Sequence, residues 1–111
     1  MLPADARLRS SSDIAVTMRQ GTKYSSRLIV LHVVGEMSQS TKVAFAVGKS
    51  VGNSVVRHRI TRRLRHILAQ QLVQFPTGSF VVVRALPGTA TATYAQLEEN
   101  MGFALAKVRA A

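Results

Sequence analysis

The chain has 111 residues, of which 47% are apolar, and its fifteen Lys and Arg outnumber five Asp and Glu to give a formal net charge of +10. This length predicts a single domain over residues 1–111, and the apolar fraction excludes a disordered chain. The chain has no cysteine, which excludes disulfides and thiolate metal sites, and no apolar run approaches the ~20 residues of a membrane-spanning helix.

The first half of the chain is predicted to form a helix and two strands. Residues 10–21 are typical of a short helix that a serine caps and Gly21 ends. Residues 27–35 and 43–47 are β-branched and apolar, so each is expected to form a strand. Because only a short polar segment joins these two strands, we expect them to pair as an antiparallel hairpin.

The second half is predicted to form a helix, a strand and a second helix. Apolar residues from 54 to about 74 follow helical spacing, and Pro76-Thr77-Gly78 should end that helix. Phe80–Arg84 is typical of a buried strand, Pro87-Gly88 of a turn, and Tyr94–Val108 of an amphipathic helix. The order α-β-β-α-β-α predicts an α+β fold, a two-layer sandwich with helices against a small sheet.

The helix that starts at residue 54 has an apolar face and a basic face. At ~100° per residue, one stripe consists of Val56, Ile60, Leu64, Ile67 and Leu68. The opposite side carries His58, Arg59, Arg62, Arg65 and His66, while Arg57 and Arg63 flank the apolar stripe. We therefore expect the apolar face to pack on the sheet and the guanidinium groups to reach outward.

The charge pattern around this helix favours a nucleic-acid partner. No carboxylate occurs between Glu36 and Glu98, an interval that holds eight Lys and Arg. Such a domain repels itself unless a polyanion neutralises it, and guanidinium groups suit phosphate and base recognition. A solvated arginine face is the simpler alternative, and an anionic membrane surface is another. A membrane-bound helix needs exposed large apolar residues, which the core requires here.

No catalytic constellation is apparent in the sequence. The five carboxylates are scattered, and His32, His58 and His66 show no metal-ligand spacing with an acid or a cysteine. A lone strand histidine such as His32 is interpreted as a core or cleft residue. The N-terminal ten residues lack the apolar segment of a signal peptide, so we expect a cytoplasmic binding protein.

The segment GKSVGNSVVRHRITRRLR, residues 48–65, resembles the signature of the bacterial ribonuclease P protein family. The matching positions are Gly52, Asn53, Val55, Arg57, Arg59, Arg62 and Arg65. Two positions depart, since His58 and Thr61 stand where the family usually has asparagine and lysine. The resemblance extends over nearly the whole chain, from ARLRSSSDIAVTMRQG near the start to PTGSFVVVRALPG.

The resemblance implies a protein subunit of ribonuclease P, an endoribonuclease whose RNA is the catalyst and which removes the 5′ leader of precursor tRNA. It also implies a fold similar to a domain of a small-subunit ribosomal protein. The side chains implied to contact the catalytic P RNA are Lys49, Asn53, Arg57, His58, Arg59, Arg62, Arg63 and Arg65. A cleft for the single-stranded leader would be lined by Ile14, Met18, His32 and Phe45.

Partners and cofactor also follow from the resemblance. The expected partners are P RNA and precursor tRNA, with no membrane and no protein partner. Mg²⁺, held mainly by RNA phosphates, would activate water for hydrolysis, so the protein supplies no catalytic side chain.

Two other functions stay open at this point. A different basic RNA-binding module, such as a ribosomal protein, would not stimulate tRNA 5′ processing. A DNA-binding helix needs base-reading side chains at its N-terminus, where Ser54, Val55 and Val56 offer little.

Overall fold

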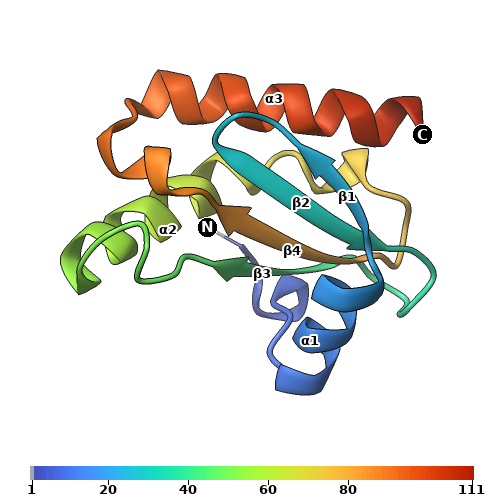
Figure 1. Ribbon diagram of the computed structural model, residues 1–111. Coiled ribbons are helices and arrows are strands. Elements are labelled where there is room, and N and C mark those ends of the chain that lie inside the picture. The colour runs from blue at the N-terminus through green and yellow to red at the C-terminus, as the bar shows by residue number, and fades with distance from the viewer. Residues whose placement is uncertain (1) are drawn as a thin grey trace.

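A computed structural model describes residues 2–111 as a four-stranded sheet with helices on both of its faces (Figure 1). The strands are β1 (Thr22–Ser25), β2 (Ile29–Val34), β3 (Lys42–Ala46) and β4 (Phe80–Ala85), and the α-helices are α1 (Ser11–Gln20), α2 (Ser54–Leu68) and α3 (Tyr94–Ala110). Short 3₁₀ turns are η1 (Ala4–Ala6), η2 (Leu72–Gln74) and η3 (Pro87–Thr91). The predicted α+β class is confirmed, and β1 is one strand more than the sequence predicted.

The sheet is organised around β4. The strand order is β1-β2-β4-β3, in which β4 pairs antiparallel with β2 and parallel with β3. The predicted hairpin between the second and third strands is therefore wrong, because β4 lies between them. β4 takes a central position because it has fully buried apolar side chains on both faces of the sheet. Val81 and Val83 lie on one face, and Val82 lies on the other. The hairpin that does form joins β1 to β2, with Thr22 opposite Val33.

The segment between β2 and β3 passes over the start of β4 instead of making a tight turn. The backbone N–H groups of Met37 and Ser38 donate to the Gly78 carbonyl, and that of Lys42 donates to the Ser79 carbonyl. Gly78 has a φ of 79°, and a Cβ there would lie 2.1 Å from the Ser38 carbonyl oxygen. Glycine is therefore required where this crossing segment meets β4.

The two faces of the sheet carry separate apolar clusters. The larger face is covered by α2 and α3, whose buried residues pack on Leu31, Val81 and Val83. The α2 side chains in this core are Ile60, Leu64, Ile67 and Leu68, as the helical spacing predicted. On the opposite face, α1 lies over a smaller cluster, as the blue helix on the far side of the sheet from α3 shows (Figure 1). The two-layer sandwich thus has α1 as an additional, partial cover.

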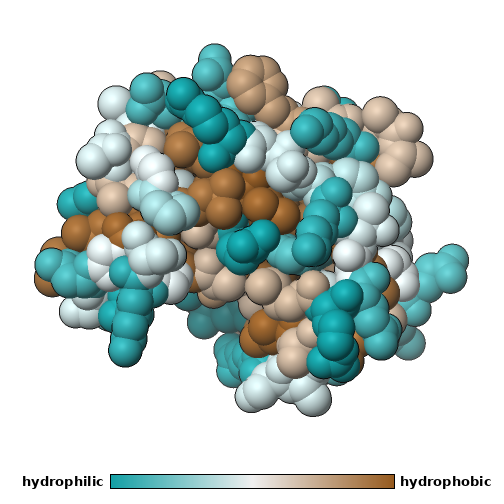
Figure 2. All heavy atoms as spheres, in the orientation of Figure 1, coloured by the Kyte–Doolittle hydropathy of each residue, from teal (hydrophilic) through white to brown (hydrophobic). Residues whose placement is uncertain are grey.

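In the same orientation, hydrophobic residues gather in the middle of the surface below α3, and hydrophilic residues surround them (Figure 2).

The helix ends follow local capping chemistry. Ser10 caps α1, since the Asp13 N–H donates to its Oγ at 3.3 Å, and Gly21 follows the last turn as predicted. α2 ends at Leu68, earlier than the predicted residue 74. The early end lets the chain turn back toward β4 and bury Phe75 in the main core.

Candidate nucleic-acid interface

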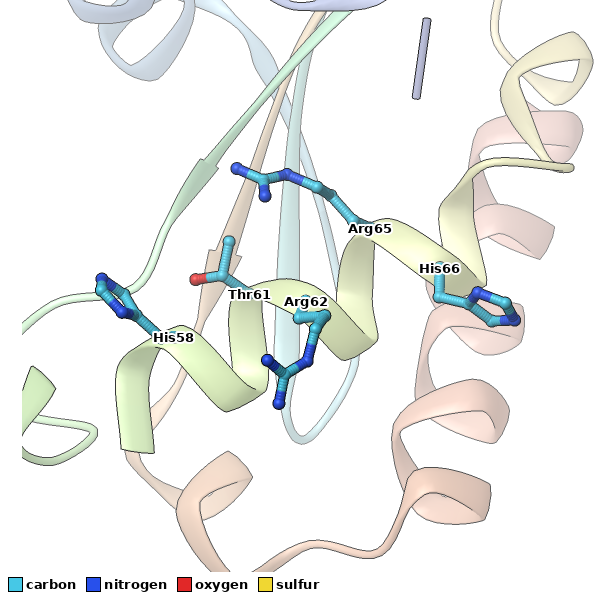
Figure 3. A pocket seen from close by; sticks show the side chains of 5 residues that line it. All are labelled: His58, Thr61, Arg62, Arg65 and His66. Atoms are coloured by element: carbon cyan, nitrogen blue, oxygen red, sulfur yellow. The ribbon is translucent and has the colours of Figure 1, made fainter. Parts of the chain in front are cut away.

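The exposed face of α2 is a basic stripe that we define by five side chains at helical spacing. They line a shallow depression of about 500 Å³ and are His58, Thr61, Arg62, Arg65 and His66. Figure 3 shows that His58, Thr61 and Arg65 project to one side of the helix, Arg62 projects between them and His66, and His66 lies at the far end. The face opposite this stripe is the buried one, so packing on the sheet forces the stripe outward.

Charge on the stripe has no local compensation. The helical neighbours of Arg62, at three and four residues along the chain in either direction, include no acid. They are His58, Arg59, Arg65 and His66. Arg65 lies over the Phe45 ring, with its guanidinium carbon 5.8 Å from the ring centroid, which keeps its stem on apolar surface. The stripe therefore presents fixed positive charge to solvent, which suits phosphate binding.

The N-terminus of α2 is fixed by one of the predicted site residues. The Val56 N–H donates to Asn53 Oδ1 at 3.0 Å, so the Asn53 carbonyl oxygen caps the helix and only its amide NH₂ is free to donate to a ligand. Lys49 is exposed in the loop before this cap. The two residues lie at one end of the stripe, as the sequence predicted.

Three of the predicted arginines lie on the flanks of α2 rather than on the stripe. Arg57 and Arg63 are half-buried, as expected from their positions beside the apolar face. Arg59 was expected on the outward side, and this is wrong: it is half-buried, and its Nη2 donates to the Ala90 carbonyl in η3 at 3.1 Å. Arg59 thus ties α2 to η3, and part of its hydrogen-bonding capacity is already used.

The predicted leader cleft is only partly assembled. Ile14 and Met18 of α1 are half-buried and pack against the smaller cluster, as Ala44 and Ala46 of β3 do, so these side chains share one apolar surface. Phe45 does not share this surface. It points to the other face of β3 because side chains alternate along a strand, and it packs against the main core.

Phe45 lines a different groove, at the carboxyl ends of the parallel strands β3 and β4. This groove measures about 510 Å³ and also includes Gly48, Ser50 and Arg84. It adjoins the loop that leads into α2. Phe45 therefore does not lie in the predicted leader cleft, which makes that part of the prediction wrong.

His32 is buried, with 2% of its surface exposed, so it does not line an open cleft. Arg84 Nε donates to His32 Nε2 at 3.3 Å, and His32 Nδ1 is buried near the Met18 backbone without a hydrogen bond of good geometry. Burial, followed by the positive charges of Arg84 and Lys23, lowers the pKa of His32, and the Met18 backbone opposes this in part. These surroundings favour the neutral ring, whose Nε2 accepts the hydrogen bond from the Arg84 guanidinium beneath α1.

Sequence reasoning missed two residues near the site. In the sequence Arg84 is only the last residue of a predicted strand. The register of β2 and β4 is what brings its side chain within hydrogen-bonding distance of His32. Tyr94 reads as the first residue of an amphipathic helix, yet its ring lies against His66, with ring centroids 6.2 Å apart. The available signal was the Thr93-x-x-Gln96 capping pattern, which places Tyr94 at the exposed start of α3.

Two further findings concern the described residues 2–111. No group of three or more His, Asp or Glu side chains there could hold a metal ion. No helix in this part of the chain is both long and apolar enough to cross a membrane.

Comparison with known proteins gives consistent matches. The family model named Ribonuclease P matches residues 2–109. The chain is 39% identical over 117 residues to the ribonuclease P protein component of Streptomyces avermitilis, covering 97% of this chain and 95% of that protein. It is 40% identical over 111 residues to the one of Mycobacterium sp. (strain KMS), covering 98% and 94%.

Solved structures share the fold. The RNase P protein of Staphylococcus aureus superposes with a TM-score of 0.82 at 21% identity, covering 93% of this chain and 96% of that one. The RNase P protein of Thermotoga maritima superposes with a TM-score of 0.77 at 16% identity, covering 95% and 96%.

Proposed function

The chain belongs to the ribonuclease P protein family, and from this membership we propose that it binds the catalytic P RNA through α2 and the 5′ leader of precursor tRNA through the α1 side of the sheet. The basic stripe of α2 is the observation that carries the proposal. It combines outward guanidinium groups, a fixed helix start at Asn53 and the absence of nearby acids.

The stripe supports RNA binding by a simple electrostatic mechanism. Each guanidinium that contacts a phosphate releases counterions, so affinity is gained from several contacts and falls as salt rises. Arg62 and Arg65 are exposed on the stripe, and Lys49 is exposed in the loop before the helix. Arg57 and Arg63 reach RNA from the flanks, whereas Arg59 contributes mainly by fixing α2 against η3.

The leader surface works by shape and apolar contact. Ile14 and Met18 form one wall, and Ala44 and Ala46 form a floor of small side chains along β3. A single-stranded segment can lie across such a surface, with Arg84 in the adjoining groove available to its phosphates. His32 supports this surface from below by orienting Arg84.

In this proposal the Mg²⁺ that activates water is held by RNA phosphates, and the protein contributes cations that reduce repulsion between the phosphates of the two RNAs. The side chains of this protein would bind the two RNAs, align them and neutralise part of their phosphate charge.

The test is cleavage of a precursor tRNA by bacterial P RNA at low Mg²⁺, with and without the protein. We expect strong stimulation at the correct 5′ site and a dependence on the basic stripe. RNA binding without stimulation would support a ribosomal-type RNA-binding protein instead.

A further inference from the structure

Two aromatic side chains meet at the end of the basic stripe. The rings of His66 and Tyr94 lie with centroids 6.2 Å apart and planes inclined at 60°, so they form an open corner rather than a closed stack. Both side chains are exposed, Tyr94 by 37%. An exposed pair of rings at this angle leaves ring faces available to a third planar group.

The backbone on both sides of the corner is fixed. Tyr94 is the first residue of α3, where the Gln96 N–H donates to Thr93 Oγ1 at 3.1 Å and the Thr93 N–H donates to Gln96 Oε1 at 2.9 Å. His66 lies on α2, one turn after Arg62, and α2 is anchored by its buried stripe. A planar ligand would therefore meet two rings carried on a fixed backbone, and it would have only their side-chain torsions to order.

The position beside arginines indicates which ligand fits. Guanidinium groups hold phosphates, but they leave the bases of an unpaired nucleotide unbound, and proteins bind such bases by stacking on aromatic rings. Phe75 and Phe80 are buried, Tyr24 is half-buried on β1, and the guanidinium of Arg65 already lies over the half-buried ring of Phe45. Phe103 is exposed, but nine residues along α3 from Tyr94 it faces nearly the opposite side of the helix.

We propose that an unpaired nucleotide of the catalytic RNA stacks its base on the His66–Tyr94 corner while Arg62 binds its phosphate. This inference rests on the proposed function of the α2 stripe and extends the RNA contact from α2 onto α3. The catalytic RNA is the source, rather than the leader, because α3 and α1 cover opposite faces of the sheet. A leader lying along α1 does not reach this corner.

The experiment measures binding of P RNA to the full-length protein over a range of salt concentrations. Tyr94→Ala removes the ring, Tyr94→Phe keeps it, and Phe103→Ala removes another exposed aromatic of the same helix. We expect Tyr94→Ala to weaken binding by roughly 5- to 100-fold, as stacking losses do. The slope of log affinity against log salt should not change, because no phosphate contact is lost. Tyr94→Phe and Phe103→Ala should bind as the wild type does.

Each other outcome overturns the proposal. Wild-type affinity in Tyr94→Ala would exclude a base on this ring, and an equal loss in Tyr94→Phe would assign the effect to the hydroxyl. A lowered salt slope would indicate an electrostatic contact instead. Thermal unfolding of each variant separates misfolding from lost contact, and His66→Ala repeats the test from the other ring. Failure of the wild type itself to bind P RNA would refute the proposed function as well.

Discussion

His32 is a titratable side chain buried beneath α1 with its Nε2 accepting a hydrogen bond from Arg84. Its surroundings favour the neutral imidazole, since burial and two nearby cations lower its pKa in the folded protein. The unfolded chain has an ordinary histidine pKa of about 6.5 and so binds the proton first as pH falls.

This arrangement predicts that acid destabilises the protein through His32. As pH falls below about 6.5, the unfolded state comes to carry up to one more proton than the folded state, so the free energy of unfolding should fall by at most about 1.4 kcal/mol per pH unit. The loss should level off once pH is below the folded pKa. Denaturant unfolding at pH 7.5, 6.5 and 5.5 measures it. His32→Gln should flatten the trend, and His58→Gln, at an exposed histidine, should leave it in place.

Arg62 and Arg59 provide a second residue-scale prediction, because they differ in what they already contact. Arg62 is exposed on the stripe, whereas Arg59 donates to the Ala90 carbonyl. Arg62→Gln should weaken P RNA binding and reduce the salt slope by roughly 0.7–0.9 for one lost phosphate contact. Arg59→Gln should instead lower the free energy of unfolding by about 1 kcal/mol, the typical net value of a hydrogen bond.

Binding titrations at several salt concentrations and thermal unfolding of both variants distinguish the two roles. If the two variants changed the salt slope equally, with the same stability, the distinction between stripe and flank would be wrong.

These same residues show what a sequence pattern can predict. Helical spacing correctly separates the buried stripe of α2 from its basic face, because the period fixes direction around the axis. Helical spacing did not predict the position of the Arg59 side chain. Its hydrogen bond to Ala90 depends on how η3, which comes later in the chain, packs on α2. Phe45 was misplaced for a related reason, because the face of a strand that each residue occupies is known only when the neighbouring strand is known.

Among the elements, the strands were harder to predict than the helices. α1 and α3 begin where serine and threonine caps occur, which are local signals. β1, with the sequence TKYS, is mostly exposed and lacks an apolar pattern, and it exists because β2 offers it an edge. The wrongly predicted hairpin of β2 and β3 has the same origin. The short polar segment that joins these two strands does not reveal that β4, which comes much later in the chain, lies between them.

The α1 element supports a prediction about substrate. Met18 contributes to the apolar wall beside Ala44 and Ala46. Met18→Gln keeps a long, helix-compatible side chain but replaces the thioether with an amide, so it should weaken binding of precursor tRNA that carries a leader. Binding of mature tRNA should stay unchanged, because it lacks the segment that lies on this wall.

The measurement is the affinity of the reconstituted ribonucleoprotein for tRNA with and without a leader. Val73→Gln, at an apolar side chain 91% exposed in η2, is the matched control and should affect neither RNA. Equal weakening of both RNAs by Met18→Gln would contradict the leader assignment.

At the scale of the whole molecule, function and stability make opposite demands on charge. A net charge of +10 on 111 residues favours encounter with RNA but repels itself in the free protein. The repulsion is concentrated at Arg62, whose neighbours on the helix are arginine or histidine. Like charges three and four residues apart each cost a helix roughly 0.2–0.5 kcal/mol.

The free wild-type protein should therefore become more stable as salt rises from low ionic strength, because screening weakens repulsion between surface charges. Arg62→Gln should be more stable than the wild type at low salt, and the difference should shrink as salt is added. With saturating P RNA the wild type should instead be the more stable of the two proteins, because it gains more binding free energy than Arg62→Gln does. Thermal unfolding of both proteins, at low and high salt and with P RNA, measures all three effects. A variant less stable than the wild type at low salt would mean that Arg62 serves the fold, and its charge could not then be explained by RNA binding alone.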